Sequence, residues 1–228
     1  MLSGIVVPGA RWITDAMVLA CKDNTVRLLP FRAKKSRILC EHATTIVGLS
    51  VLRKNEVVSG SQDGRIKLSR RKDGTTIAIG RHAPVLTCLA TLPERQVVSG
   101  GTDGTVRLWD TRTRKYRTVL RHEGIVCSVM VIDERAVVSC GEDGVVQVWD
   151  QFTDKVRTIL DFEKREESWE LAAASDGLRT VFGSEFHHMW SLSTAESSAV
   201  NISAIIHLSR ACPETCLGAA YTGILGST

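Results

Sequence analysis

Short apolar runs alternate with tight polar turns along most of the chain, and their spacing is that of β-strands. Residues 97–99 form a β-branched run, and the Asp-Gly pair at 103–104 supplies turn chemistry because both residue types tolerate positive φ. In the segment 105–109, Val106 and Leu108 lie two residues apart and therefore share one face. The pattern predicts four short strands in each stretch of about 40 residues, with no helix between them.

The same pattern recurs with a step of 40 residues. Three features repeat in register: a Val-Val-Ser run at 57–59, 97–99 and 137–139, a histidine at 42, 82 and 122, and a Trp-Asp pair at 109–110 and 149–150. A four-stranded sheet this small cannot bury both of its faces alone. Repeated sheets are therefore expected to stack around an axis, as the blades of a propeller do.

We expect a single all-β domain over residues 1–228, with about five full four-stranded blades and most of a sixth. The expected repeat units are 1–38, 39–78, 79–118, 119–160, 161–203 and a partial unit at 204–228. The fifth unit is degenerate: the segment 181–184 aligns with the Val-Val-Ser strand, and His187 and His188 take the place of the turn. We interpret that histidine pair as a turn and not as a metal site.

Two complete copies of one signature resemble the WD-repeat family, whose fold is that of the G-protein β subunit. The residues that carry the resemblance are His82, Ser99, Asp103, Trp109 and Asp110, and again His122, Ser139, Asp143, Trp149 and Asp150. The resemblance implies a β-propeller in which His, Ser and Asp join the Trp indole N–H in a buried hydrogen-bond network. A catalytic triad would occur once, whereas this set repeats with the blades, so we interpret it as structural and expect no enzyme.

The number of blades is smaller than the family usually has, because its propellers close with seven blades and sometimes with six or eight. Closure removes exposed sheet edges, and the apolar segment 217–225 would make a poor edge. Three explanations stay open. The chain is a fragment of a longer protein, a partner donates strands or a blade, or a small ring closes with N-terminal residues completing the last blade.

Composition and cysteine usage indicate an ordinary globular protein of the cytoplasm or nucleus. The chain is 43% hydrophobic and 24% charged, with a net charge of +4. Its seven cysteines are odd in number and contain no CxxC, so we expect reduced thiols. Cys212 and Cys216 are the only close pair and lack further ligands, so we expect no metal and no cofactor. The N-terminal residues lack a basic stretch followed by a long apolar core, so we expect no signal peptide there, and no stretch has the roughly 18 apolar residues needed to span a membrane.

The family resemblance places one set of residues on the top face, near the mouth of the central channel. These lie just before each turn Asp or just after each conserved His: Lys22, Gln62, Thr102, Glu142, Thr44, Pro84 and Gly124. We expect protein contacts there.

Basic residues gather in the links between the third and fourth strands. They are Arg32, Lys34, Lys35, Arg37, Arg70, Arg71, Lys72, Arg112, Arg114, Lys115, Arg117, Lys155 and Arg157. Since links of successive blades lie side by side, these charges are expected to form a basic arc on the bottom face and rim, suited to phosphates or acidic protein surfaces. We expect no aromatic side chains among them for base stacking, and therefore no sequence-specific reading of RNA.

Three functions follow from these patterns. The first is a scaffold subunit that holds other proteins in a larger assembly. The second is a ribonucleoprotein subunit that binds RNA phosphates through the basic arc. The third is a substrate receptor of a cullin-RING ubiquitin ligase, because Trp109-Asp110-Thr111-Arg112 matches the W-D-x-R ending that some WD-repeat proteins use to dock on the ligase adaptor.

Overall fold

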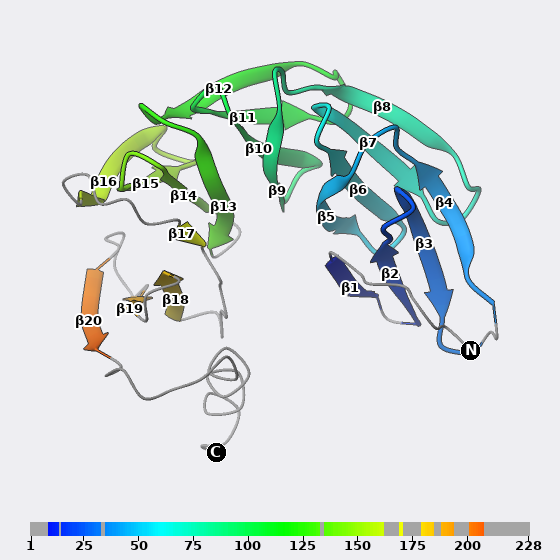
Figure 1. Cartoon of the computed structure of the whole chain (residues 1–228), viewed down its shortest axis with the longest axis horizontal. Coiled ribbons are helices and arrows are strands. Elements are labelled where there is room, and N and C mark those ends of the chain that lie inside the picture. The colour runs from blue at the N-terminus through cyan, green and yellow to red at the C-terminus, as the bar shows by residue number, and fades with distance from the viewer. Residues whose placement is uncertain are drawn as a thin grey trace. The chain divides into compact units, whose positions relative to one another are not determined.

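The computed structural model describes residues 9–13, 15–32, 35–132, 135–161, 169–170, 179–184, 188–193 and 201–207. All regular structure in this part of the chain is β, and it forms five four-stranded antiparallel sheets (Figure 1). The prediction of an all-β fold of four-stranded blades is confirmed. The chain divides into two compact units, Met1–Lys164 and Arg165–Thr228.

The first unit holds four sheets, named here blades 1 to 4. Blade 1 consists of β1 (Gly9–Ile13), β2 (Ala16–Ala20), β3 (Thr25–Pro30) and β4 (Arg37–Glu41). Blade 2 consists of β5 (Ile46–Arg53), β6 (Glu56–Ser61), β7 (Arg65–Arg70) and β8 (Thr76–Arg81). Blade 3 consists of β9 (Leu86–Leu92), β10 (Gln96–Gly101), β11 (Thr105–Asp110) and β12 (Tyr116–Arg121). Blade 4 consists of β13 (Val126–Ile132), β14 (Ala136–Gly141), β15 (Val145–Asp150) and β16 (Lys155–Asp161).

The second unit holds blade 5. Its strands are β17 (Trp169–Glu170), β18 (Arg179–Ser184), β19 (His188–Ser193) and β20 (Asn201–His207). The strand expected at 181–184 is part of β18, and His188 begins β19. The residues proposed for a sixth unit beyond 207 lie outside the described part of the chain, and so does His187.

The repeated Val-Val doublet has a direct structural reason. Neighbouring side chains on a strand point to opposite faces of the sheet. Val57 packs with blade 1, whereas Val58 packs with blade 3. In the same way Val97 packs against blade 2 and Val98 against blade 4. Blades 2 and 3 are therefore apolar on both faces, and burial between two neighbours stabilises each of them.

A left-handed residue closes the turn between the second and third strand of each blade in the first unit. Gly64, Gly104 and Gly144 have φ values of +86°, +73° and +75°, and Asn24 takes the same place in blade 1 with φ of +62°. In blade 3 the approach is also close, since a Cβ on Gly104 would lie 2.4 Å from the carbonyl oxygen of His122. Glycine is favoured there by both conformation and space.

The outer strands continue a few residues past the expected unit boundaries. Boundaries at 38, 78, 118 and 160 fall inside β4, β8, β12 and β16 respectively. Each outer strand then leads directly to the next conserved histidine, at 42, 82 or 122. The described residues include no helix with the length and apolarity to cross a membrane.

Candidate functional site

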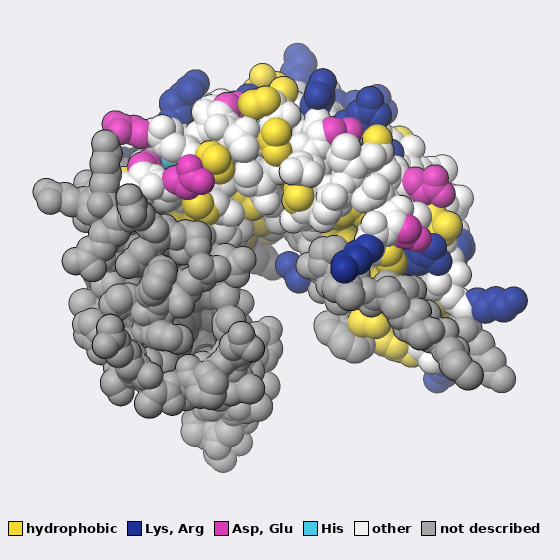
Figure 2. All heavy atoms as spheres, viewed as in Figure 1, with side chains coloured by type: hydrophobic (Ala, Val, Ile, Leu, Met, Phe, Trp, Pro, Cys, Tyr) yellow, Lys and Arg dark blue, Asp and Glu magenta, His cyan; other side chains and the backbone are white. Residues whose placement is uncertain are grey.

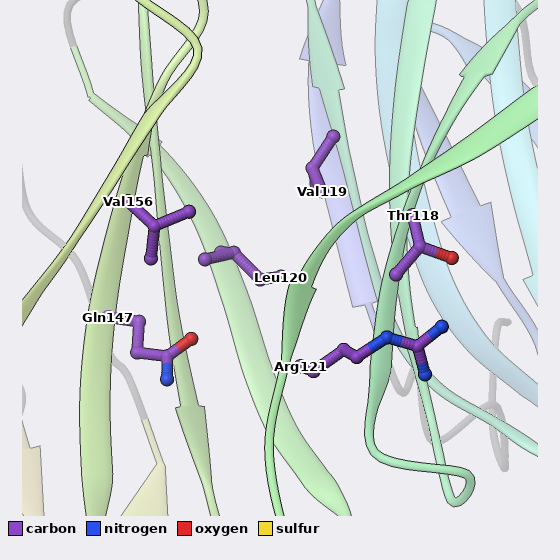
Figure 3. Close-up of a pocket in the computed structure, with 6 residues that line it drawn as sticks. All are labelled: Thr118, Val119, Leu120, Arg121, Gln147 and Val156. Atoms are coloured by element: carbon purple, nitrogen blue, oxygen red, sulfur yellow. The ribbon is translucent and has the colours of Figure 1, made fainter.

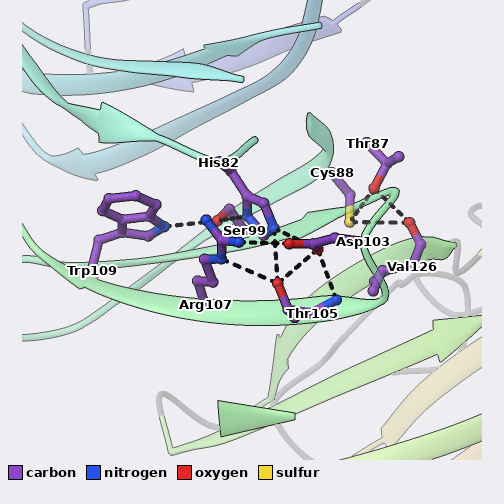
Figure 4. Close-up of polar contacts among 9 residues, drawn as sticks. All are labelled: His82, Thr87, Cys88, Ser99, Asp103, Thr105, Arg107, Trp109 and Val126. Atoms are coloured by element: carbon purple, nitrogen blue, oxygen red, sulfur yellow. Dashed lines mark hydrogen bonds and ion pairs between the residues drawn. The ribbon is translucent and has the colours of Figure 1, made fainter. Parts of the chain in front are cut away.

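A buried polar network joins blade 2 to blade 3 (Figure 4). His82 follows β8 of blade 2, yet its ring is fully buried against the strands of blade 3. Its Nδ1 lies 2.6 Å from Ser99 Oγ, and its Nε2 lies 3.2 Å from Asp103 Oδ1 and 3.1 Å from Thr105 Oγ1. The Trp109 indole N–H donates to Ser99 Oγ over 2.7 Å. Four of the five residues of the blade 3 signature therefore meet in one network, and Asp110 instead accepts hydrogen bonds from the following link.

The donor of each hydrogen bond in this network follows from its two terminal groups, because the Trp109 indole N–H can only donate and the Asp103 carboxylate can only accept. Ser99 accepts from Trp109, so its hydroxyl proton is available for His82 Nδ1, and His82 Nε2 then donates to Asp103. A neutral imidazole fits this arrangement, and burial lowers the pKa of His82 although the hydrogen bond to Asp103 opposes it. Burial would raise the pKa of Asp103, but hydrogen bonds from Thr105 and His82 outweigh it and lower this pKa to about 2.

Blade 4 uses the same residue types in a different arrangement. His122 turns its Nε2 toward Ser139 Oγ at 2.8 Å and its Nδ1 toward Asp143 Oδ1 at 3.1 Å. The Trp149 indole N–H donates to Asp154 Oδ1 over 2.8 Å and makes no bond to Ser139. The structure thus brings His122, Ser139 and Asp143 together as expected and places Trp149 elsewhere.

The preceding blade explains why Trp149 and Trp109 have different hydrogen-bond partners. Gly80 of β8 faces Trp109, and a Cβ at Gly80 would lie 2.2 Å from Trp109 Cζ3. The residue 40 positions later is Leu120 of β12, which packs with Trp149 in the core between blades 3 and 4. Since Leu120 occupies space that Gly80 leaves to the indole, the ring of Trp149 takes another position.

Blade 2 has a network without tryptophan. His42 Nδ1 lies 2.8 Å from Ser61 Oγ, and its Nε2 lies 2.8 Å from Ser59 Oγ. The Ser61 hydroxyl donates to Asp63 Oδ1 over 2.5 Å, so a serine separates the ring from the carboxylate. Burial, together with the nearby charge of Lys67, lowers the pKa of His42 to about 4. The imidazole is therefore neutral near pH 7.

These networks bury the serine hydroxyls and histidine rings of the repeats. Ser59, Ser99 and Ser139 are at most 1% exposed, and every histidine ring that contacts them is buried. A substrate therefore has no access to these hydroxyls. Within the described ranges, no group of three or more His, Cys, Asp or Glu side chains is placed to hold a metal ion. Cys212 and Cys216 lie outside those ranges.

The proposed top-face residues lie where neighbouring loops meet. The turn before β7 hydrogen-bonds to the loop after β4, with Gln62 N donating to Thr45 O and Asp63 N to Thr44 Oγ1. Exposed members of this set are Lys22, Gln62, Pro84 and Glu142, and half-buried members are Thr44, Thr102 and Gly124. They stay a predicted contact surface.

The basic residues of the links form what we call the basic face. In the described part of the chain they sit between the third and fourth strands of blades 1 to 4 or within the first residues of the fourth strand, except Arg70, which ends β7. Lys34 lies outside the described residues. The members with no ion pair there are Arg32, Lys35, Arg37, Lys72, Arg112, Arg114, Lys115, Lys155 and Arg157, all exposed; Arg37 also donates a hydrogen bond to the carbonyl oxygen of Arg71. Figure 2 shows Lys and Arg side chains along the outer edge of the first unit, over β8 and β12.

Three acidic side chains near this face are bound to arginines. Asp15 of blade 1 pairs with Arg71 of blade 2, and Arg117 of blade 3 pairs with Asp154 of blade 4 over 2.9 Å. Glu56 of blade 2 lies 3.4 Å from Arg95 of blade 3 and 3.6 Å from Arg70. These bridges tie each blade to the next. Asp73 and Asp110 also lie in the links, where their carboxylates accept hydrogen bonds from the turns themselves.

Sequence reasoning missed three aromatic side chains beside these cations. Phe31, Tyr116 and Phe152 are 53%, 52% and 76% exposed. The guanidinium of Arg135 lies 5.3 Å from the centre of the Phe152 ring. The expectation that aromatic residues are absent from the links is therefore wrong. The available signal was position: Phe152 stands 40 residues after Arg112, where the other blades have a cation.

Comparison with known proteins identifies the repeats. The sequence model of the WD domain, G-beta repeat family matches residues 74–110 and 114–150. No curated protein sequence matches the chain. The structure is similar to the computationally designed Ika8 protein, with a TM-score of 0.67 and 24% identity over 83% of this chain and 58% of that chain. It is also similar to the computationally designed Ika4 protein, with a TM-score of 0.56 and 27% identity over 67% of this chain and 92% of that chain.

Proposed function

Since this chain carries WD40 repeats, we propose that it is a non-catalytic scaffold that holds other macromolecules through its loops. The observation that carries the proposal is that its polar groups fall into two sets, one buried and one exposed. The serine hydroxyls and histidine rings of the repeats are buried in networks between blades. The basic face, in contrast, presents cations without ion pairs on successive links. Such a surface is suited to a partner with a complementary negative face.

A charge-reversal experiment tests this function. The triple variant Lys72→Glu, Arg112→Glu and Lys115→Glu changes the basic face at exposed residues without ion pairs in the described structure. The control Arg53→Glu, Arg65→Glu and Arg81→Glu makes the same charge change at exposed strand ends outside both the basic face and the predicted top face; Arg65 also loses its ion pair with Asp63. Each is purified gently from cells and analysed by native mass spectrometry. We expect the first variant to lose a co-purifying partner and the control to keep it; equal retention by both would argue against the basic face.

Binding of RNA is the second candidate, and the exposed aromatic side chains favour it. Phe152 is 76% exposed, with the Arg135 guanidinium 5.3 Å from its ring centre, and stacking of bases on aromatic rings is worth about 1–3 kcal/mol per base. Phosphate contacts release counterions, so affinity for a single-stranded RNA of about ten nucleotides should fall steeply as salt rises. The triple variant should weaken that binding and flatten its salt dependence. Unchanged binding would remove this candidate.

Docking on a cullin-RING ligase adaptor is the third candidate. Arg112 is exposed, and its backbone N–H donates to Asp110 Oδ1 over 2.7 Å, so the link that presents it is ordered by the W-D-x-R motif itself. Arg112→Ala should abolish co-purification of the adaptor, whereas Lys72→Ala at the matching position of blade 2 should leave it intact. Equal recovery of the adaptor with both variants would remove this candidate.

A further inference from the structure

An open groove lies on the outer side of the first unit, between blades 3 and 4 (Figure 3). It has a volume of about 400 Å³ and is lined by Thr118, Val119, Leu120, Arg121, Gln147 and Val156. Figure 3 shows Leu120 of β12 pointing toward Val156 and Gln147 of the neighbouring blade. We call it the side groove.

The junction between blades 2 and 3 shows what fills this space elsewhere in the same protein. The positions 40 residues before Gln147 and Val156 hold Arg107 and Tyr116. The Tyr116 ring centre lies 4.7 Å from that of Trp109, and the Arg107 guanidinium lies 4.8 Å from the centre of the Tyr116 ring. In blade 3 an aromatic side chain and an arginine therefore stack beside Trp109, the ring that Gly80 of blade 2 approaches.

Blade 4 has smaller residues at both positions. Val156 replaces the tyrosine and is 48% exposed, and Gln147 replaces the arginine. Neither side chain has the ring or the length to cover the junction. The side groove is thus the space that an aromatic side chain of the chain itself occupies one repeat earlier.

We propose that the side groove binds an aromatic side chain of a partner protein, presented by an acidic segment. The repeat supplies the argument for the ring, because the groove has the apolar walls of Val119, Leu120 and Val156 and lies where Tyr116 lies in blade 3. Charge supplies the argument for the segment. Arg121 lines the groove and makes no ion pair among the described residues, and exposed Lys155 and Arg157 follow on β16. This site is separate from the basic residues changed in the triple variant.

The comparison of blades also suggests a variant that fills the side groove, called here the plug variant. The double variant Gln147→Arg and Val156→Tyr transplants the blade 3 pair into blade 4 and should fill the side groove with residues that the fold already accommodates. The reverse variant Arg107→Gln and Tyr116→Val should open a second groove at the junction of blades 2 and 3. Thermal melting of each full-length variant reports whether the fold is kept.

Binding is measured by fluorescence anisotropy with a labelled nine-residue peptide that has a central Tyr flanked by Asp and Glu. Its two control peptides have Ala at the centre or Lys in the flanks. We expect both control peptides to bind at least tenfold more weakly than the Tyr peptide. The plug variant should lower the affinity for the Tyr peptide at least tenfold, and the reverse variant should bind two peptides per protein instead of one. Equal binding to the plugged protein, or no binding by the parent, would overturn the proposal.

A second measurement does not depend on the folding of a variant. Benzoylphenylalanine at the central position of the peptide is photo-crosslinked to the parent protein, and the products are mapped by mass spectrometry. Crosslinks to residues 118–121 or to Val156 support the side groove. Crosslinks confined to other segments would contradict it, whatever the affinity of the peptide.

Discussion

Blades 3 and 4 have the same signature residues at the same spacing, yet their tryptophans bond to different partners. Trp109 donates to the buried Ser99, whereas Trp149 donates to Asp154 in the link before β16. The residue that faces each ring from the preceding blade differs, being Gly80 in one case and Leu120 in the other. The comparison teaches that a repeat signature specifies a set of polar groups, while the neighbouring blade decides how they connect.

Substitution of Gly80 tests this explanation most strongly. A leucine there would meet the Trp109 ring, so Gly80→Leu should cost about 3 kcal/mol of unfolding free energy and displace the indole from Ser99. Urea unfolding and the NMR signal of the indole N–H measure the two effects. Ala78→Leu, on the same strand at an exposed position, should change stability by less than about 0.5 kcal/mol. Similar stability of both variants would show that Gly80 does not control the tryptophan.

The two serines should differ in their contribution to stability. Ser99→Ala leaves both the Trp109 N–H and a nitrogen of His82 without a partner, so we expect a loss of about 2–3 kcal/mol. Ser139→Ala leaves only a nitrogen of His122 unpaired and should cost about 1 kcal/mol. Chemical unfolding of the two variants measures the difference. A larger loss for Ser139→Ala would contradict the assigned networks.

Blade 2 extends the comparison to acid. Its His42 has a pKa lowered from 6.5 to about 4, so the unfolded chain takes up a proton that the folded chain refuses. The free energy of unfolding is therefore unaffected by protonation of this histidine above about pH 6.5 and falls as the pH is lowered toward 4. At pH 5 the loss is about 2 kcal/mol. Urea midpoints measured across this range give the slope. His42→Asn should be less stable at neutral pH and lose less stability on acidification; an unchanged slope would assign the effect to other groups.

The smallest effect is expected at Asp154. Asp154→Asn removes the charge that pairs with Arg117 and weakens the acceptor of the Trp149 N–H, while Asn keeps the left-handed backbone that this position adopts. We expect a small fall in the melting temperature. Arg114→Asn, at the matching left-handed position of blade 3, should cause none. The fall should shrink in high salt, and an effect that is independent of salt would point to the indole bond alone.

Much of the fold follows from the sequence because its determinants are local and repeated. The Val-Val doublet, the Asp-Gly turn and the alternation of Val106 and Leu108 each specify a strand or a turn within a few residues. The residues of the blade 3 network could be named for the same reason, because each has a fixed place in the repeat. The position of Trp149 was not, because it depends on Leu120, a residue of another blade whose role no signature marks.

The surface was harder to predict than the interior. The links contain the basic residues that the sequence showed, but which of them keep a free charge depends on Asp15, Glu56 and Asp154, each bound to an arginine of an adjacent blade. The side groove arises from the absence of a ring at Val156, which becomes visible only when blade 4 is compared with blade 3.

Each conserved histidine directly follows the last strand of one blade, but its ring is buried against the next blade. This arrangement has a consequence for engineering the chain. A cut between β8 and β9 would separate His82 from its own strand or from Ser99, so the sheet is not the piece that can be excised or moved. A cut in the exposed link 112–115 keeps every histidine with its partners. Circular permutants and inserted domains should therefore be tolerated at the basic links and not between blades.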